Sequence, residues 1–244
     1  MELSDRLVNI IELVTPGYVV ADVGCDHAYV AISLIEQEIA PRVIAMDVGE
    51  GPLQQAKVHI AEAGLSDYIE TRLSDGVQML KAGEADCLIL AGMGGRLMQK
   101  IMTEGAAVLS EMKEFILQPQ SEIAEFRHFL QDNGYHIVSE SMVYEDEKYY
   151  PMMKAKHGEM SYENEVDFRY GRILLHEENP ILFQYLSWEK KLYVNLLEEL
   201  EETEETERIA ERKQELQAEL NLVNEALKYY KYGADGFSED YLLM

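Results

Sequence analysis

The residues best suited to chemistry lie in one short segment, residues 19–28, with the sequence VVADVGCDHA. An apolar run there ends in an acid, Asp22, and Gly24 follows just before a predicted helix. A cofactor that lies across the carboxyl end of a strand needs a residue without Cβ where the backbone comes close, and Gly24 meets that need. The free N–H groups of a helix start lie nearby. The segment therefore predicts a cofactor site.

The glycine spacing indicates which cofactor this is. Dinucleotide-binding fingerprints carry two further glycines, whereas Asp26 and Ala28 stand at those places here. Asp26 also adds a negative charge where a pyrophosphate would lie. This pattern disfavours NAD(P) and favours a cofactor without phosphate whose amino-acid end carries an ammonium group. S-adenosylmethionine (SAM) fits that description.

Two further acids follow the next predicted strands. Asp47, with Val48 beside it, lies about twenty residues beyond the glycine turn, where a carboxylate can accept both ribose hydroxyls. Asp75 and Gly76 follow the third strand and form a pair suited to reading an adenine edge. Each acid alone could be a turn or cap residue, because Asp favours such positions. The ordered set of acids after three successive strands predicts a nucleoside cofactor.

A glycine-rich segment follows the fourth predicted strand, with the sequence Ala91-Gly92-Met93-Gly94-Gly95. The end of this strand faces the transferable group in sheets of this kind. Three glycines within four residues would let a planar substrate approach the backbone there. A plain flexible loop is the alternative.

A second polar segment, Gln118-Pro119-Gln120, ends the fifth predicted strand. Proline fixes the backbone at this point, and the two amides can hydrogen-bond the edge of a base. The tripeptide could equally be a turn.

A parallel sheet must position these segments at a common edge. From residue 3 to about residue 156, short β-rich runs alternate with helical patterns, which is typical of an α/β fold. The expected strands are residues 18–23, 43–46, 68–73, 85–90 and 115–117, and the expected helices are residues 3–14, 28–38 and 53–63. Two final runs, 135–143 and 149–155, flank an acidic turn and suggest a closing hairpin. We therefore expect a Rossmann-like class I methyltransferase sheet in residues 1–158.

Beyond Gly158 the pattern changes to helical stripes. Apolar residues recur at helical spacing in residues 182–200 and again in residues 209–227, separated by the acidic run EETEETE. Two helices folded back as an antiparallel coiled-coil hairpin explain this pattern. One long helix through the acidic run is the alternative, because Glu is a good helix former. We expect residues 159–244 to form a helical coiled-coil domain.

The net charge of −25 is spread over both predicted domains. A nucleic-acid partner would have to meet a local basic patch against this acidic background. Composition alone favours a small-molecule or protein substrate.

The composition also indicates the cellular compartment of the protein. No apolar run approaches the roughly 20 residues of a membrane span, and the N-terminus has acids where a signal peptide would be basic. Cys25 and Cys87 form no paired ligand spacing, and two lone thiols fit a reducing compartment. We expect a cytoplasmic protein without membrane contact or metal.

Four segments together resemble the bacterial tRNA (adenine-22-N1)-methyltransferase family, known as TrmK. They are Leu3-Ser4-Asp5-Arg6-Leu7, Asp22-Val23-Gly24-Cys25-Asp26-His27-Ala28-Tyr29, the AGMGG segment and Gln118-Pro119-Gln120, with Tyr149-Tyr150 after the acidic turn. The family also carries a trailing helical hairpin. Gln120 departs from the family pattern, which ends in asparagine or a similar residue, and keeps an amide with a longer reach.

The resemblance implies methyl transfer from SAM to N1 of adenine 22 in tRNA. That nitrogen has a lone pair and can attack the methyl group in line, so no nucleophilic side chain or metal is required. The product base is cationic, so a carboxylate such as Asp26 would stabilise it. His27 is a candidate proton acceptor or base contact, and Met93 and Gly94 would lie beside the transferable group. Asp26 could instead be a helix N-cap or bind the SAM ammonium.

Substrate contacts follow from the same resemblance. A flipped or loosened base is implied, with Tyr29 as a stacking platform, although ordinary helix packing would also explain Tyr29. The candidate phosphate contacts are basic residues: Arg6, Lys57, Arg72, Arg96, Lys100 and Arg127. Arg96 and Lys100 lie one turn apart beyond the glycine-rich segment, beside the expected target base.

Two other classes of function stay open. One is a SAM-dependent methyltransferase acting on a small molecule or a protein, which the charge favours. The other is a nonenzymatic module in which the hairpin binds a partner and the Rossmann-like domain senses a nucleotide. We expect a monomer in either case.

Overall fold

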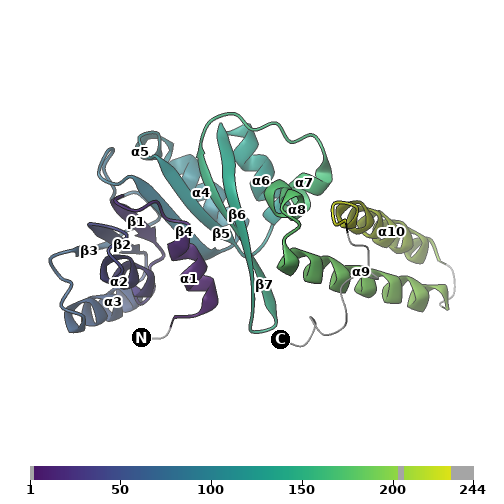
Figure 1. The fold of residues 1–244 in the computed structure, drawn as a ribbon, viewed down its shortest axis with the longest axis horizontal. Helices are drawn as coiled ribbons and strands as arrows, with labels where there is room; N and C mark the ends of the chain where they lie inside the picture. The colour runs from purple at the N-terminus through teal and green to yellow at the C-terminus, as the bar shows by residue number, and fades with distance from the viewer. Residues whose placement is uncertain (1–2, 203–205, 232–244) are drawn as a thin grey trace. The chain divides into compact units, whose positions relative to one another are not determined.

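The structure, a computed structural model, describes residues 3–202 and 206–231 (Figure 1). Contacts divide the chain into two compact units, Met1–Ser161 and Tyr162–Met244. The assignment of a catalytic domain and a coiled-coil domain to residues 1–158 and 159–244 stays a prediction, and residues 203–205 and 232–244 of the latter lie outside the described residues.

The first unit is a seven-stranded sheet with helices beside it. Its strands are β1 (Val20–Val23), β2 (Val43–Asp47), β3 (Ile69–Leu73), β4 (Cys87–Met93), β5 (Glu114–Pro119), β6 (Tyr135–Glu145) and β7 (Lys148–His157). Its helices are α1 (Asp5–Glu12), α2 (Tyr29–Glu36), α3 (Glu50–Glu62), α4 (Gly95–Glu104), α5 (Ala106–Leu109) and α6 (Ile123–Asp132).

The strand order explains where a ligand can bind. The sheet runs β3-β2-β1-β4-β5-β7-β6, with β1 to β5 parallel and β7 antiparallel to both of its neighbours. From β1, strands β2 and β3 are added on one side of the sheet, whereas β4 and the later strands are added on the other side. This reversal leaves a crevice at the carboxyl ends of β1 and β4, which is the usual ligand position in such sheets. The predicted mixed α/β sheet is confirmed.

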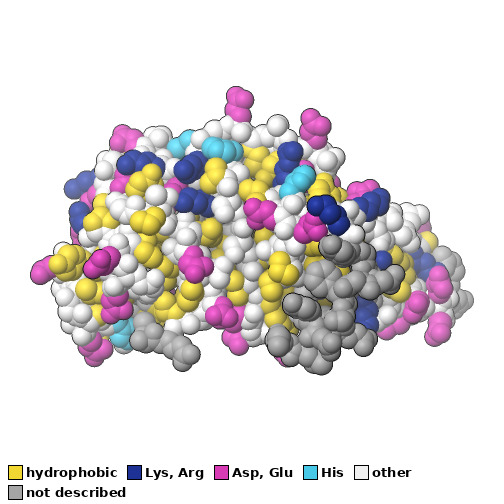
Figure 2. Space-filling model, viewed as in Figure 1, with side chains coloured by type: hydrophobic (Ala, Val, Ile, Leu, Met, Phe, Trp, Pro, Cys, Tyr) yellow, Lys and Arg dark blue, Asp and Glu magenta, His cyan; other side chains and the backbone are white. Residues whose placement is uncertain are grey.

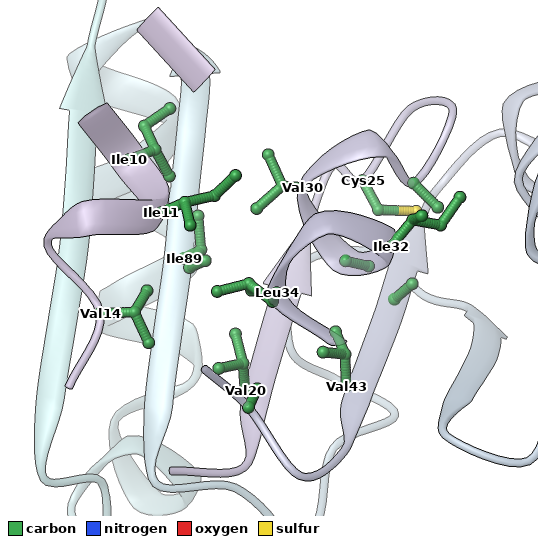
Figure 3. Packing of buried hydrophobic residues seen from close by; sticks show 14 of the residues in the cluster. Ile10, Ile11, Val14, Val20, Cys25, Val30, Ile32, Leu34, Val43 and Ile89 are labelled. Carbon is green, nitrogen blue, oxygen red and sulfur yellow. The ribbon is translucent and has the colours of Figure 1, made fainter. Parts of the chain in front are cut away.

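The core around β1 explains why the central strand is so apolar. Every residue of β1 is buried, and Val20 belongs to one apolar cluster with Ile10 and Ile11 of α1 and Leu34 of α2, all labelled in Figure 3. Leu34 is fully buried, so its truncation to alanine would destabilise the fold by roughly 2–5 kcal/mol. This apolar packing holds β1 in place between its neighbours.

The closing hairpin joins β6 and β7 through a two-residue turn. Asp146 and Glu147 both have positive φ, at 48° and 60°, and Glu145 pairs with Lys148 across the turn. Positive φ at both central positions is the geometry of a type I′ turn, whose twist matches that of the flanking strands. The predicted hairpin after the parallel strands is confirmed.

The second unit consists of helices in its described residues: α7 (Glu165–Tyr170), α8 (Arg172–His176), α9 (Pro180–Glu201) and α10 (Glu207–Leu227). Thr206 caps α10 by accepting a hydrogen bond from the Ile209 N–H, so α9 does not continue into it. Beyond the end of α10, the Tyr230 hydroxyl donates to the Asn179 carbonyl at the start of α9. The two helices therefore form an antiparallel hairpin, and the single long helix is wrong. Coiled-coil packing between them stays a prediction.

Candidate functional site

A pocket of about 430 Å³ lies at the carboxyl ends of β1, β2 and β4. It brings together several residues predicted from sequence: Arg6, Asp22, Gly24, Asp26, His27, Tyr29, Asp47, Ala91, Gly92 and Gln120. Leu7, Cys25 and Val30, which the sequence did not single out as site residues, complete its lining. Acids, amides and backbone turns thus converge on one hollow at the crevice.

The loop after β1 is strained and closely held. Gly24, Asp26 and Ala28 have φ of 76°, 47° and 61°. The N–H groups of Gly24 and Cys25 both donate to the Met46 carbonyl, at 2.8 and 3.0 Å. The helix α2 begins after Ala28, without a side-chain cap from the described part of the chain. Asp26 is therefore not the N-cap of this helix, and that alternative is wrong.

Gly24 lies against Met93 from the neighbouring strand β4. A Cβ placed on Gly24 would lie well inside van der Waals contact of Met93 Cε. Any larger residue would have to displace Met93 or move the loop, besides taking up a positive φ. The need for glycine thus comes from the positive φ, whereas the end of the flexible Met93 side chain can move aside.

Asp22 is the most unusual acid of the pocket. Its side chain is 5% exposed, and its Oδ2 atom has no hydrogen-bond partner among the described residues. Burial, and then the negative charge of Asp47, raise the pKa of Asp22 to about 7. A buried carboxylate without a partner is costly, and a cationic ligand would remove much of that cost.

Asp47 and Asp26 are held differently. Asp47 accepts a hydrogen bond from the Gly49 N–H at 2.8 Å and one from the Asp26 N–H at 3.3 Å. The Asp26 side chain is exposed, with Oδ1 3.5 Å from Nε2 of His27. The loop therefore presents the Asp26 carboxylate and the His27 ring together at the pocket.

Gln118 connects the end of β4 to the N-terminal helix α1. It is fully buried, and its Oε1 accepts from the Gly92 N–H at 3.0 Å and from Arg6 at 3.2 Å. The register of β4 and β5 shifts between Ala91 and Met93, which frees the Gly92 N–H for this bond. Arg6 also lies over the Tyr150 ring, 5.6 Å from its centroid. Gln118 thus positions other residues, whereas Gln120 lines the pocket.

Comparison with known proteins places this geometry in a family. A family model described as a methyltransferase domain matches residues 3–153. The Bacillus subtilis tRNA (adenine(22)-N(1))-methyltransferase is 29% identical over 234 residues, which cover 94% of this chain and 98% of that protein. The chain belongs to the TrmK family.

Solved structures of TrmK-family proteins share the fold of both units. A Streptococcus pneumoniae protein, a proposed tRNA (m1A22) methyltransferase, is 32% identical with a TM-score of 0.86, over 93% of this chain and all of that one. A structure of the same protein in complex with S-adenosyl-L-methionine has a TM-score of 0.83. The B. subtilis TrmK structure is 28% identical with a TM-score of 0.81, over 92% of this chain and 98% of that one.

Other predicted residues of this TrmK-family chain lie outside the described lining of the pocket. Asp75, Gly76 and Lys100 line a second pocket of about 240 Å³ between the loop after β3 and α4. Val48 is 71% exposed beside Asp47. Pro119 is buried at the end of β5.

Gly94 and Arg96 lie at the start of α4. Gly94 is its N-cap residue, and a Cβ placed there would lie 3.0 Å from Ser121 Oγ. The Arg96 side chain is 84% exposed and lies 3.4 Å from a Glu122 carboxylate oxygen. Arg96 is therefore accessible to a ligand, at a short distance along the chain from the pocket residue Gly92.

Two of the predicted phosphate contacts are wrong. Arg127 is 1% exposed and pairs with the buried Glu140 at 2.8 Å. Arg72 donates from both terminal nitrogens to Glu84, at 2.6 Å each. Neither guanidinium is available to a phosphate. Figure 2 shows Lys and Arg side chains interspersed with acidic and apolar ones on the visible face.

The described residues also bear on metals and membranes. Across residues 3–202 and 206–231 there is no cluster of three or more His, Cys, Asp or Glu side chains placed to hold a metal ion. Within the same ranges, the helices are all too short or too polar to cross a bilayer.

Proposed function

We propose that this chain transfers a methyl group from SAM to N1 of adenine 22 in tRNA. One observation carries the cofactor part: the buried Asp22 side chain lines the pocket, and its Oδ2 atom has no partner in the described chain. The substrate part is supported by the B. subtilis relative, which is named as an adenine-22 N1-methyltransferase.

The pocket residues fit SAM. The unpartnered Asp22 oxygen suits the ammonium end of its methionine moiety. Gly24 and Gly92 bring backbone close to the ligand, and Asp47 can accept ribose hydroxyls. Ala91, near the end of β4, adds to this wall, while Val48, after β2, and Asp75 and Gly76, after β3, would hold the adenine end.

The chain would then supply position and charge. Bound SAM supplies an electrophilic methyl group on its sulfonium sulfur. Asp26, exposed at the pocket, would stabilise the positive charge that develops on the adenine ring. Tyr29 would stack on the target base, and Gln120 and His27 would contact its edge. Most of the rate would come from alignment, with Met93 and Gly94 shaping the turn beside the methyl group.

Binding of tRNA would depend on a small number of basic side chains. Arg6 projects into the pocket from α1 and is held by Gln118, with Pro119 fixing the end of that strand. Arg96 and Lys100 lie on α4 and would contact phosphates near the target base.

A SAM-dependent methyltransferase for a small molecule or protein is the second candidate. The net charge of −25 favours it, because nucleic-acid binding rests largely on cation–phosphate contacts. Steep loss of activity with added salt would favour tRNA, and the absence of any salt dependence would favour this alternative.

Radiolabelled SAM with two tRNA transcripts tests the proposal. One transcript carries adenine at position 22, and the matched control carries guanine there. We expect label only in the first, and about a hundredfold slower transfer by Asp26→Asn, since one charge-stabilising group contributes on this scale. Equal labelling of both transcripts would contradict the adenine-22 assignment but leave a methyltransferase. Binding of SAM without any transfer would contradict the proposal that the chain is an enzyme.

The proposal extends to a cytoplasmic monomer. Both cysteines are free and buried in the structure, as in proteins of reducing compartments. Light scattering of the purified chain measures its mass directly, and a dimer mass would overturn the monomer.

A further inference from the structure

Three aromatic rings pack together on the α2 and α3 side of the pocket. The His59 ring, from α3, stacks on Tyr29 with centroids 5.3 Å apart and planes 13° apart. His27 lies 5.6 Å from each of these two rings. His27 and Tyr29 line the pocket, while His59 lies outside its described lining. His59 therefore backs the two rings that a ligand would meet.

The backbone contact of His59 is equally specific. Its Nδ1 lies 3.1 Å from the carbonyl oxygen of His27. A carbonyl only accepts, so the Nδ1 atom of His59 carries the proton. His27 itself stands between Asp26 and Ala28, which both have positive φ. Residues other than glycine adopt a positive φ at an energetic cost, so tertiary contacts must hold them in place.

We propose that His59 is a positioning residue with two separable roles, and this inference rests on the proposed function. Its Nδ1–H group holds the loop of residues 26–28, which shapes the cofactor pocket. Its ring holds the Tyr29 platform at the angle on which the target adenine stacks. A side chain that only filled space would need neither the hydrogen bond nor the near-parallel ring.

Two variants separate these roles. His59→Asn keeps a donor on the atom bonded to Cγ but removes the ring, and His59→Phe keeps the ring but removes the donor. Gln54→Ala is the matched control, because Gln54 is exposed on the same helix. Calorimetry with S-adenosylhomocysteine measures the cofactor pocket, and kcat with tRNA at saturating SAM measures the platform.

We expect His59→Phe to weaken S-adenosylhomocysteine binding about fivefold to tenfold, the effect of one lost hydrogen bond, and to lower kcat as well, because the loop it holds carries Asp26 and His27. We expect His59→Asn to lower kcat about threefold to tenfold, the effect of one lost aromatic pair, with binding within about twofold. Nitrogen NMR of the wild type should show the Nδ1–H form of His59.

Two results would overturn the inference while the wild type still methylates adenine 22. One is equal loss of binding and kcat in both variants, and the other is an Nε2–H tautomer. Unchanged values in both variants would overturn it as well. A wild type that binds the cofactor but labels no tRNA would instead overturn the proposed function, and the binding data would still test the Nδ1–H contact.

Discussion

Two buried carboxylates, one in each unit, differ in their hydrogen-bond partners. Glu189 of α9 is 3% exposed, and Asp22 of β1 is 5% exposed. Four donors surround Glu189: the hydroxyls of Tyr170, Tyr185 and Tyr193 at 2.8–3.0 Å and the Arg169 guanidinium at 3.2 Å. Asp22 has an oxygen without a partner in the described chain. A satisfied acid holds structure together, whereas an unsatisfied one at a pocket is suited to a ligand.

The same contrast separates two arginines of the first unit. Arg127 is buried with Glu140, so its charge is used within the fold. Arg96 is exposed beside Glu122 at the start of α4, so its charge is accessible. The two arginines, both predicted as phosphate contacts, thus differ in burial and in ion-pair partner. The prediction of phosphate contacts from sequence could not make this division.

The largest expected effect is at Glu189. Glu189→Ala would leave Arg169 and three tyrosine hydroxyls without their shared acceptor, and should lower the free energy of unfolding of the second unit by about 3–5 kcal/mol. Urea denaturation followed by fluorescence of the single tryptophan, Trp188 on the same helix, measures this. Glu198→Ala, at an exposed site of α9, is the control. A loss below about 1 kcal/mol would show that the cluster does not depend on this acid.

Asp22→Asn should raise the free energy of unfolding, whereas Glu189→Ala should lower it. The pKa of Asp22 is raised to about 7 in the folded chain, above the ordinary 3.8, so the unfolded chain ionises first as pH rises. The carboxyl therefore lowers stability progressively between about pH 4 and 7, and the penalty persists above pH 7. Asn removes it and should stabilise the ligand-free protein at pH 8 by roughly 2–4 kcal/mol.

Thermal denaturation from pH 4 to 8 checks that expectation, with exposed Asp67→Asn as the control. Cofactor binding should move the other way: it weakens in Asp22→Asn and, in the wild type, strengthens as pH rises through about 7, because the ammonium favours the ionised carboxylate. Equal pH profiles for wild type and Asp22→Asn would break the contrast between the two acids.

Gly24→Ala tests the glycine that lines the pocket beside Asp22. The substituted residue must keep a positive φ, which should cost roughly 1–2 kcal/mol of stability, and its Cβ must displace the Met93 methyl group, which should lower cofactor affinity about tenfold. Gly64→Ala is a matched control, because Gly64 has φ of 71° but no described atom within 4 Å of the added Cβ. Similar losses in both variants would mean that the contact with Met93 is unimportant.

The smallest effect is expected at Arg96. Arg96→Gln should weaken tRNA binding by about threefold and reduce the slope of log K against log salt by about 1, as for one lost phosphate contact. Arg42→Gln is the control, because Arg42 is also exposed and paired but lies at the amino end of β2. Filter binding from 50 to 200 mM salt distinguishes them. An unchanged slope would place Arg96 among surface ion pairs.

Local patterns predicted the fold well because its elements depend on short stretches of chain. Each strand of the sheet overlaps its predicted range, and the antiparallel hairpin of the second unit follows from its apolar stripes. The boundaries differ where long-range contacts decide them. β5 begins at Glu114, a buried acid bound to Lys154 of β7 at 3.0 Å, and no local pattern predicts a charge inside a buried strand.

The pocket was predictable where its residues lie in one motif. Asp22, Gly24 and Asp47 follow strand ends, so topology alone brings them together. The contacts of His59 with His27 and of Arg6 with Gln118 join residues 32 and 112 positions apart. They depend on how helices pack on the sheet, which periodicity does not specify.

The strand order described above also has a kinetic consequence. β1 must pair with β4, whose first paired residue, Cys87, lies far along the chain from Val20, whereas β6 and β7 are joined by a tight turn. Contacts between distant residues form late because they close large loops. The pocket needs both β1 and β4, so a growing or partly folded chain has no cofactor site. Cofactor binding would therefore slow unfolding of the finished sheet without speeding its assembly.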